Sequence, residues 1–451
     1  MTEDLLAKVR NTAAYARMRM GQSRVPYLPE ERLHEMRDRR LQQIVRYAAE
    51  TVPYYRDLFR AEGINPADIR TVEDLDRIPL IDKQQVAEHP ERFVSTSRWG
   101  KAARLATTSG TTGAALKVYH DRHSLLLASA VALRERDVRT GGFGISPDCR
   151  FVAVTLPGSA SVVAPTSKPR TRFARVKQYG LSLSVLQPLE EVIAAINQVR
   201  PEMIVGYGSY LGALFTTLTV RGTYMHMPRL VVYFADALTQ AGRRVICDEL
   251  GIAVMSVYGA AEAFRIGFSC EQGTGHHLHA DVAHVRIVDR NGQPAPRGET
   301  GEVVISNLVN RGTVLLNYRL GDIAALSDTR CPCGRTLPLL ANLEGRVEDV
   351  IYLRNGRFVY PGAVRDVMEL WEEVLQYQLI QHEADVFELK LTTVRPDAFE
   401  RVSGELVTAL RRLLGESARI EPVYHDERLE PGPGGKFRLI VSLPKDKVLP
   451  Q

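Results

Sequence analysis

The sequence has few cysteines and no long apolar run. Five cysteines in 451 residues, two of them in Cys331-Pro332-Cys333, do not resemble the disulfide framework of a secreted protein. No stretch approaches the ~18 consecutive apolar residues of a membrane-spanning helix. The charged N-terminal stretch also lacks the apolar core of a signal peptide. We therefore expect a cytoplasmic protein without a membrane partner.

Charge of one sign is also not in excess. Lysine and arginine number 58 and aspartate and glutamate 53, which leaves a net charge of +5. Because the signs are interspersed, this balance gives no reason to expect a nucleic-acid partner. The one basic cluster, residues 168–177, has the composition of a solvated loop, with anion binding as the alternative.

The length and the residue patterns predict an α/β protein with more than one domain. Amphipathic helical patterns such as residues 30–50 dominate the first hundred positions. Short apolar runs then alternate with helical patterns, such as residues 240–250, up to residue 344, which predicts a large domain of mixed sheets flanked by helices. This domain includes a β-rich subdomain with a turn at Asn291-Gly292. From residue 345 to 451, a hairpin, a helix over residues 363–373, two strands and another helix predict a small, mobile α+β domain.

The most informative segment is a run of small and hydroxyl-bearing residues. It follows Leu105-Ala106 and precedes a strand-like Lys117-Val118-Tyr119. The run consists of Thr108, Ser109, Gly110, Thr111, Thr112 and Gly113. Small residues let a loop close around a polyphosphate, whose oxygens accept hydrogen bonds from hydroxyl and amide groups. A Ser/Thr-rich turn between two strands is the alternative.

Four further motifs follow this run in a fixed order. They are Tyr258-Gly259-Ala260-Ala261-Glu262, Tyr318-Arg319-Leu320-Gly321-Asp322, Gly345-Arg346 and Gly434-Gly435-Lys436-Phe437-Arg438. The series resembles the adenylate-forming superfamily of acyl-CoA synthetases, nonribosomal adenylation domains and luciferases. More narrowly, it resembles the phenylacetate–CoA ligase branch and its capsule-biosynthesis relatives. The resemblance runs from about residue 54 to the C-terminus.

The resemblance implies a ligase that activates a carboxylic acid with ATP and Mg²⁺. The run from Thr108 to Gly113 would hold the β- and γ-phosphates, and Tyr258 would stack on adenine, with Gly259 and Ala260 beside it. Glu262 would hold Mg²⁺, a hard cation that prefers oxygen ligands; a solvated loop carboxylate is the alternative. Ala261 stands where the family usually has threonine or serine.

The later motifs imply the remaining nucleotide contacts. Asp322 would accept hydrogen bonds from the ribose hydroxyls, with Leu343 nearby, and Arg346 would contact ribose or phosphate. Lys436, in a glycine-rich loop, would be the catalytic cation. The alternative for Asp322 is a turn aspartate, for Arg346 a surface arginine and for Lys436 an exposed loop lysine. Glu348 occupies the hinge position, where the family places aspartate or lysine.

The identity of the acid and of its acceptor follows less directly. The resemblance places six residues at the acid pocket: Tyr207, Tyr210, Phe234, Ala235, Asp236 and Phe264. Their aromatic surface favours an aromatic acid, although the same aromatics suit a core. Family precedent implies transfer to coenzyme A. One alternative is transfer to a carrier protein, an amine or another acceptor. A second alternative is a nucleotide-binding protein without catalysis. We expect a monomer or a homodimer.

A separate cluster predicts structural zinc. Cys331 and Cys333 form a Cys-x-Cys knuckle, and Cys270 with a nearby histidine supplies a distant pair, a set that fits tetrahedral Zn²⁺. The resemblance implies that the histidine is His277. His276 and His279 are the other candidate ligands. Inert thiols and imidazoles are the alternative.

Overall fold

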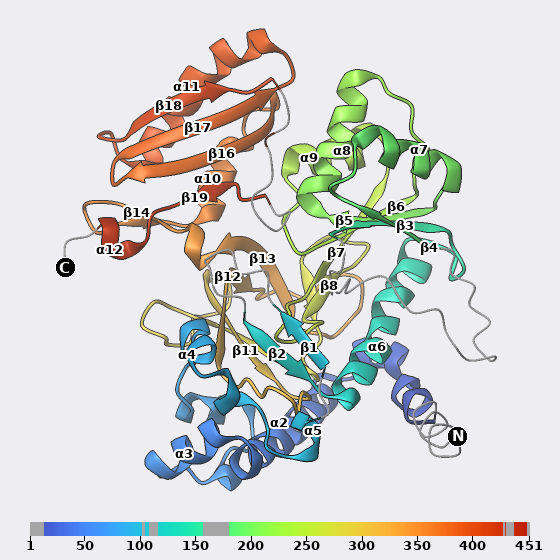
Figure 1. Ribbon diagram of the computed structural model, residues 1–451, viewed down its shortest axis with the longest axis vertical. Coiled ribbons are helices and arrows are strands. Elements are labelled where there is room, and N and C mark those ends of the chain that lie inside the picture. The colour runs from blue at the N-terminus through green and yellow to red at the C-terminus, as the bar shows by residue number, and fades with distance from the viewer. Residues whose placement is uncertain are drawn as a thin grey trace. The chain divides into compact units, whose positions relative to one another are not determined.

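The computed structural model describes residues 13–101, 104–107, 116–156, 180–426, 429 and 437–448. The chain divides into two compact units (Figure 1). The first unit comprises Met1–Pro147, Ser256–Leu320 and Ala324–Asn342, and the second comprises Asp148–Met255, Gly321–Ile323 and Leu343–Gln451. The chain therefore enters the second unit for the last time close to the predicted boundary at residue 345. The division into domains 1–344 and 345–451 stays a prediction.

The first unit begins with helices, as the sequence predicts. α2 (Glu30–Thr51) has two glutamates in its first turn, where the helix dipole favours negative charge. Its buried residues, Leu33, Leu41, Ile44, Val45 and Ala48, fall on one face. Further helices before residue 102 include η1 (Gln22–Tyr27), α3 (Pro53–Ala61), η2 (Pro66–Asp68), η3 (Val72–Arg77), α4 (Lys83–Glu88), η4 (Pro90–Phe93) and α5 (Arg98–Lys101).

A hairpin and a long helix follow. β1 (Arg104–Thr107) pairs antiparallel with β2 (Lys117–His120), so the predicted returning strand is confirmed. Asp121 then caps α6 (Arg122–Asp137), because its Oδ1 accepts hydrogen bonds from the backbone N–H groups of the first turn. A π-helical turn, η5 (Val138–Gly142), ends this segment.

The rest of the first unit is an antiparallel β-structure. β10 (Ala283–Val288) pairs with β11 (Gly301–Asn307), and β9 (His276–Leu278) pairs with β8 (Gly267–Ser269) and with β13 (Leu339–Arg346). β12 (Tyr318–Leu326) lies between β11 and β13. At the predicted turn, the N–H of Gly292 donates to the carbonyl of Asp289 at 3.1 Å, and the φ of Gly292 is +76°. The turn is thereby confirmed.

The second unit contains a parallel sheet of the order β4-β3-β5-β6. Every residue of β3 (Phe151–Thr155) and of β5 (Met203–Tyr207) is buried, as expected for parallel strands covered on both faces. The other elements are β4 (Gly180–Ser184), α7 (Leu189–Val199), α8 (Gly208–Arg221), β6 (Leu230–Phe234), α9 (Gln240–Arg244), η6 (Val245–Glu249) and β7 (Ala253–Tyr258). The helix predicted for residues 240–250 is thus an α-helix only to Arg244 and continues as a π-helical turn.

The C-terminal part of the second unit has a hydrophobic core formed wholly by residues between Ile351 and Ile440. Its sheet has the order β18-β17-β16-β19, and α11 (Pro396–Leu414) lies against it (Figure 1). Residues of β17 (Val386–Thr393) alternate between buried and partly exposed positions. The other elements are η7 (Val347–Asp349), β14 (Ile351–Tyr352), β15 (Phe358–Val359), α10 (Pro361–Met368), β16 (Val374–Glu383), β18 (Arg419–Tyr424), β19 (Ile440–Val441) and α12 (Lys445–Val448).

Together these elements confirm the predicted α/β class with mixed sheets. The helix predicted for residues 363–373 ends earlier, at Met368. Within the described residues, no helix combines the length and apolar character needed to span a bilayer.

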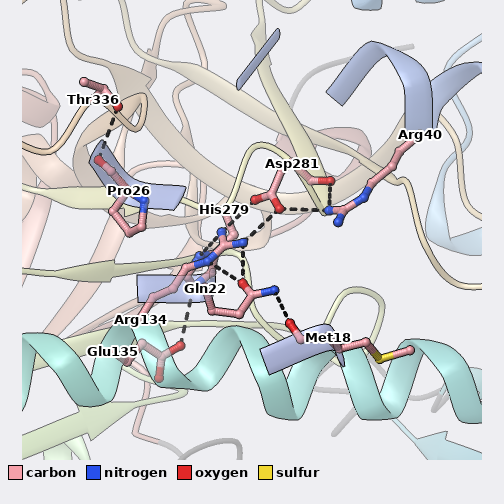
Figure 2. Close-up of polar contacts among 9 residues, drawn as sticks. All are labelled: Met18, Gln22, Pro26, Arg40, Arg134, Glu135, His279, Asp281 and Thr336. Carbon is pink, nitrogen blue, oxygen red and sulfur yellow. Dashed lines mark hydrogen bonds and ion pairs between the residues drawn. The ribbon is translucent and has the colours of Figure 1, made fainter. Parts of the chain in front are cut away.

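A buried ionic cluster fastens the N-terminal helices to the rest of the first unit (Figure 2). Arg134 of α6 is fully buried and donates to the Asp281 carboxylate from Nη1 at 2.7 Å and from Nη2 at 2.9 Å. It also donates to Oε1 of Gln22 in η1 at 2.9 Å and 2.7 Å. Arg40 of α2 donates to the same Asp281 at 2.8 Å. Asp281 therefore joins α2, α6 and, through Arg134, η1.

Glu135 extends this cluster on the next residue of α6. It forms an ion pair with Arg265, and its Oε1 lies 3.5 Å from Nε2 of His279. Burial raises the pKa of Glu135, but Arg265 and His279 outweigh it and bring the pKa down to about 2. The carboxylate is therefore charged at neutral pH.

Candidate active site

The segment after β7 forms a tight turn that carries Glu262. The backbone N–H groups of Ala263 and Phe264 both donate to the carbonyl of Ala260, at 3.2 Å and 2.6 Å. Phe264 has a φ of +54°, so the chain reverses sharply there. Glu262 is only 6% exposed, and its Oε1 accepts a hydrogen bond from the Tyr318 hydroxyl at 3.2 Å. The turn holds a buried carboxylate in a polar setting.

Two buried side chains hold the backbone of this turn. Nε2 of His120 lies 2.6 Å from the Ala261 carbonyl, which only accepts, so Nε2 carries the proton. Asn307 donates from Nδ2 to the Glu262 carbonyl at 2.9 Å. Burial lowers the pKa of His120 to about 4, so the ring is neutral at neutral pH.

In the second unit, Asp322 and Arg346 lie in contact. Nη1 of Arg346 donates to Oδ1 of Asp322 at 2.7 Å. The Asp322 side chain is 10% exposed and that of Arg346 is 43% exposed. The structure thus brings together the carboxylate and the guanidinium that the sequence predicts at the nucleotide, while Leu343 lies half-buried in β13.

Glycines precede both of these residues at positions where a side chain would be strained. Gly321 has a φ of +80° and Gly345 a φ of +139°. A Cβ on Gly345 would lie 2.9 Å from Cβ of Pro361. These glycines allow the backbone to present Asp322 and Arg346.

The residues predicted for the acid pocket divide between the two units. In the second unit, the rings of Tyr207 and Phe234 meet edge to face at 5.5 Å, and both side chains are buried, as is Tyr210. Ala235 has a φ of +71°, and Asp236 accepts hydrogen bonds from the N–H and hydroxyl of Ser209.

In the first unit, the Phe264 ring lies 3.9 Å from the His120 ring. Tyr258 is buried and meets His276 edge to face at 6.0 Å. Gly259, Ala260 and Ala261 are half-buried.

The predicted hinge contacts the segment that follows the glycine-rich loop. Glu348 lies in η7, and its carbonyl accepts hydrogen bonds from Ser442 at 2.8 Å and from Arg438 at 3.3 Å. Arg438 also donates to Oδ1 of Asp349 from Nε at 3.0 Å. Arg438 therefore ties this segment to the hinge.

The residues predicted at the phosphates fall outside the described residues. This holds for Thr108, Ser109, Gly110, Thr111, Thr112 and Gly113, and for Lys436. The chain on either side is described: β1 and β2 bring residues 107 and 117 opposite each other. The roles predicted for residues 108–113 and for Lys436 stay predictions.

The four predicted zinc ligands lie together in the first unit. One ligand atom from each of Cys270, His277, Cys331 and Cys333 lies within 4.8 Å of the others. Sγ of Cys270 is 3.6 Å from Sγ of Cys331, and Sγ of Cys333 is 3.3 Å from Nε2 of His277. Zinc–sulfur bonds of about 2.3 Å place tetrahedral sulfurs about 3.8 Å apart. The donor atoms and their spacing fit a closed zinc site.

The two other candidate histidines have different neighbours. His276 contacts the Ser256 hydroxyl at 2.8 Å, and His279 lies beside Glu135 and Arg134. Burial lowers the pKa of His277 to about 4, with nearby Arg335 acting in the same direction. Arg335 in turn donates to Glu271, which adjoins Cys270, at 3.0 Å.

The chain is similar to known ligases over almost its full length. No family model matches the chain. It is 29% identical to the phenylacetate-coenzyme A ligase of Thermus thermophilus, over 94% of this chain and 100% of that protein. It is 24% identical to the ligase of the same name from Aromatoleum evansii, over 87% of this chain and 90% of that protein. The chain is thus similar to phenylacetate-coenzyme A ligases over nearly its whole length.

A solved structure shares the fold of this chain. It is a 2-hydroxyisobutyryl-CoA ligase in complex with 2-HIB-AMP, which this chain matches with a TM-score of 0.75 and 19% identity. The match covers 93% of this chain and 91% of that one. The resemblance inferred from the motifs is thereby confirmed.

Sequence reasoning did not find the side chains that hold the Glu262 turn. His120 and Asn307 each end a strand, and neither belongs to a motif of the series. The only sequence signal for His120 is its position at the end of the strand after the glycine–hydroxyl run.

Proposed function

We propose that this protein is an acid–thiol ligase that activates a carboxylic acid with ATP and transfers the acyl group to coenzyme A. The observation that carries the proposal is the similarity to the Thermus thermophilus phenylacetate-coenzyme A ligase along the whole of that protein. Two described features support it. These are the buried Glu262 and the contact between Asp322 and Arg346.

The reaction has two steps. A carboxylate oxygen of the acid attacks the α-phosphorus of ATP, the bond to the β-phosphate breaks, and pyrophosphate leaves. The sulfur of coenzyme A then attacks the acyl carbon of the adenylate, AMP leaves, and the thiol proton passes to solvent. Charge accumulates on the phosphoryl oxygens in the first step, so the site needs cations and hydrogen-bond donors there.

The residues of the chain have these proposed roles. The segment from Thr108 to Gly113 binds the β- and γ-phosphates, Tyr258 stacks on adenine, and Asp322 accepts from the ribose hydroxyls. Arg346 contacts ribose or phosphate, and Lys436 neutralises the transition state. The carboxylate of Glu262, a hard oxygen donor, fits Mg²⁺. When bound there, Mg²⁺ would offset phosphate charge.

The substrate acid is proposed to be aromatic. Tyr207 and Phe234 are buried at the ends of adjacent strands, β5 and β6, and supply apolar, aromatic surface. The relatives' name, phenylacetate-coenzyme A ligase, points to the same class of acid.

Acid-dependent exchange of labelled pyrophosphate into ATP tests the first step. A panel of aryl and short acyl acids should contain at least one that supports exchange, and no exchange across the panel would remove the proposal. Adding coenzyme A should yield a thioester detectable by mass spectrometry. Exchange without a thioester would favour the alternative acceptors, a carrier protein or an amine.

We also propose that Cys270, His277, Cys331 and Cys333 bind a structural Zn²⁺. Four protein ligands leave no open position for a substrate, which favours a structural role. The ion would join the turn that contains Cys331 and Cys333 to β8 and β9, because Cys270 follows β8 and His277 lies in β9.

Elemental analysis and thermal unfolding test the zinc site. The wild type should contain one zinc per chain. Cys331→Ser should lose the metal and unfold at a lower temperature. Cys149→Ser, a buried cysteine outside the cluster, is the matched control and should keep its zinc. A wild type purified without zinc that gains no stability when zinc is added would exclude the site.

A further inference from the structure

The backbone on both sides of Glu262 is held by buried side chains. The Ala261 carbonyl belongs to the peptide group before the Glu262 Cα, and the Glu262 carbonyl belongs to the one after it. His120 donates to the first at 2.6 Å and Asn307 to the second at 2.9 Å. These two contacts restrict both peptide planes and therefore the φ and ψ of Glu262, which set the direction of its Cα–Cβ bond.

Both anchors are held in place by strands. His120 is the last residue of β2 and pairs with Arg104 of β1, and it is 1% exposed. Asn307 is the last residue of β11, pairs with Ala283 and is 3% exposed. Oδ1 of Asn307 accepts from the N–H groups of Val309 and Asn310, both at 3.0 Å. The amide plane of Asn307 therefore cannot rotate away from the Glu262 carbonyl without losing these bonds.

Apolar packing beside the turn leaves some free space. A small pocket lies beside Phe264, lined by apolar residues that include Leu127, Val131 and Val309. Loss of the polar anchors would leave Phe264 room to shift into this space, and Glu262 would move with it.

His120 also connects two parts of the proposed active site. It ends the hairpin whose connecting loop contains Thr108 to Gly113, and its Nε2 reaches the turn that carries Glu262. A displacement of the turn would therefore change the direction of the carboxylate relative to the hairpin.

We propose that His120 and Asn307 are positioning residues that hold the Glu262 turn in the conformation that binds the Mg²⁺–ATP complex. The inference rests on the proposed function and deepens it, because it concerns the same site. Residues that orient a metal ligand typically change metal affinity or activity by about 10- to 100-fold when they are replaced.

Replacing His120 tests this with a paired design. The side-chain amide of glutamine can donate from nearly the same place as Nε2 of histidine, whereas leucine fills the space without a donor. His120→Leu should raise the Mg²⁺ concentration needed for half-maximal ATP binding by about 10-fold or more, and His120→Gln should restore most of the affinity. ATP binding in EDTA, measured by calorimetry, should be similar for all three proteins.

Asn307→Ala should show the same selective loss of Mg²⁺-dependent binding. Asn197→Ala is the matched control, since Asn197 accepts from the His226 N–H in the second unit and does not contact the turn. It should leave the Mg²⁺ dependence unchanged.

Two results would overturn the inference. One is an unchanged Mg²⁺ dependence in His120→Leu and Asn307→Ala. The other is an equal loss of ATP binding with and without Mg²⁺, which would indicate a general structural role. Because the readout is binding, it is separate from the catalytic proposal, which fails only if the wild type shows no acid-dependent exchange.

Discussion

Replacing Arg134 with methionine should destabilise the first unit strongly. The change removes two hydrogen bonds to the Asp281 carboxylate, at 2.7 Å and 2.9 Å, and two to Gln22 (Figure 2). The side chains of Arg134 and Asp281 are both 0% exposed. The variant therefore leaves a buried carboxylate with Arg40 as its remaining ion-pair partner among the described residues.

The magnitude follows from the fate of that carboxylate. Removing one partner of a buried ion pair typically costs about 3–5 kcal/mol. Because Arg40 still donates to Asp281 at 2.8 Å, we expect the lower end, about 3 kcal/mol. For domains of about 150–250 residues this corresponds to a fall of about 6–12 °C in the unfolding temperature.

Tryptophan fluorescence can report this unit separately. The chain has two tryptophans, Trp99 in the first unit and Trp371 in the second. In a Trp371→Phe background, Trp99 reports unfolding of the first unit in urea or on heating. Arg136→Met, two positions further along α6 and only half-buried, is the control and should change stability by no more than about 0.5 kcal/mol.

A double variant separates the ion pair from simple packing. Arg134→Met with Asp281→Leu removes both buried charges, so it should be more stable than Arg134→Met alone. A loss of less than about 1 kcal/mol in the single variant, or additive losses in the double variant, would mean that the Arg134–Asp281 ion pair does not stabilise the first unit.

Three further predictions concern other residues. Burial raises the pKa of Glu135, but Arg265 and His279 lower it overall to about 2. The charged carboxylate therefore stabilises the fold at pH values above the pKa that Glu135 has in the unfolded chain. That contribution should be lost as the pH falls from about 4.5 to about 2, and Glu135→Gln should flatten this part of the stability profile. Asp322→Asn should raise the KM for ATP by about 10- to 100-fold with little change in stability; an unchanged KM would remove its ribose role. Lys436→Ala should suppress acyl-adenylate formation while leaving ATP binding largely intact, and an unaffected rate would remove its catalytic role.

Local patterns in the sequence predicted some of the helices and strands. Runs such as residues 203–205 are apolar throughout because a parallel strand is covered on both faces. Buried residues recur every fourth position in α11 because one face packs on the sheet. The helix expected to reach residue 250 changes before that residue from an α-helix to a π-helical turn. Hydrophobic periodicity does not distinguish a π-helical turn from an α-helix.

Contacts between distant residues could be predicted only where chemistry restricts them. Cys270 and Cys331 are 61 positions apart, yet thiols and an imidazole in that pattern suggest a shared ion. Nothing comparable marks Arg134 and Asp281, 147 positions apart, since arginine and aspartate usually lie at the surface. The contacts of His120 and Asn307 could not be predicted from the sequence either. Their role depends on which carbonyls they face, and only the folded chain shows that.

The most direct test of the account is pyrophosphate exchange with the wild-type protein, ATP and Mg²⁺, with and without each carboxylic acid. The account predicts that label enters ATP only when a suitable acid is present, and that the rate is greatest for an aromatic acid. Exchange that does not depend on any acid, or no exchange with any acid while ATP binds normally, would contradict it.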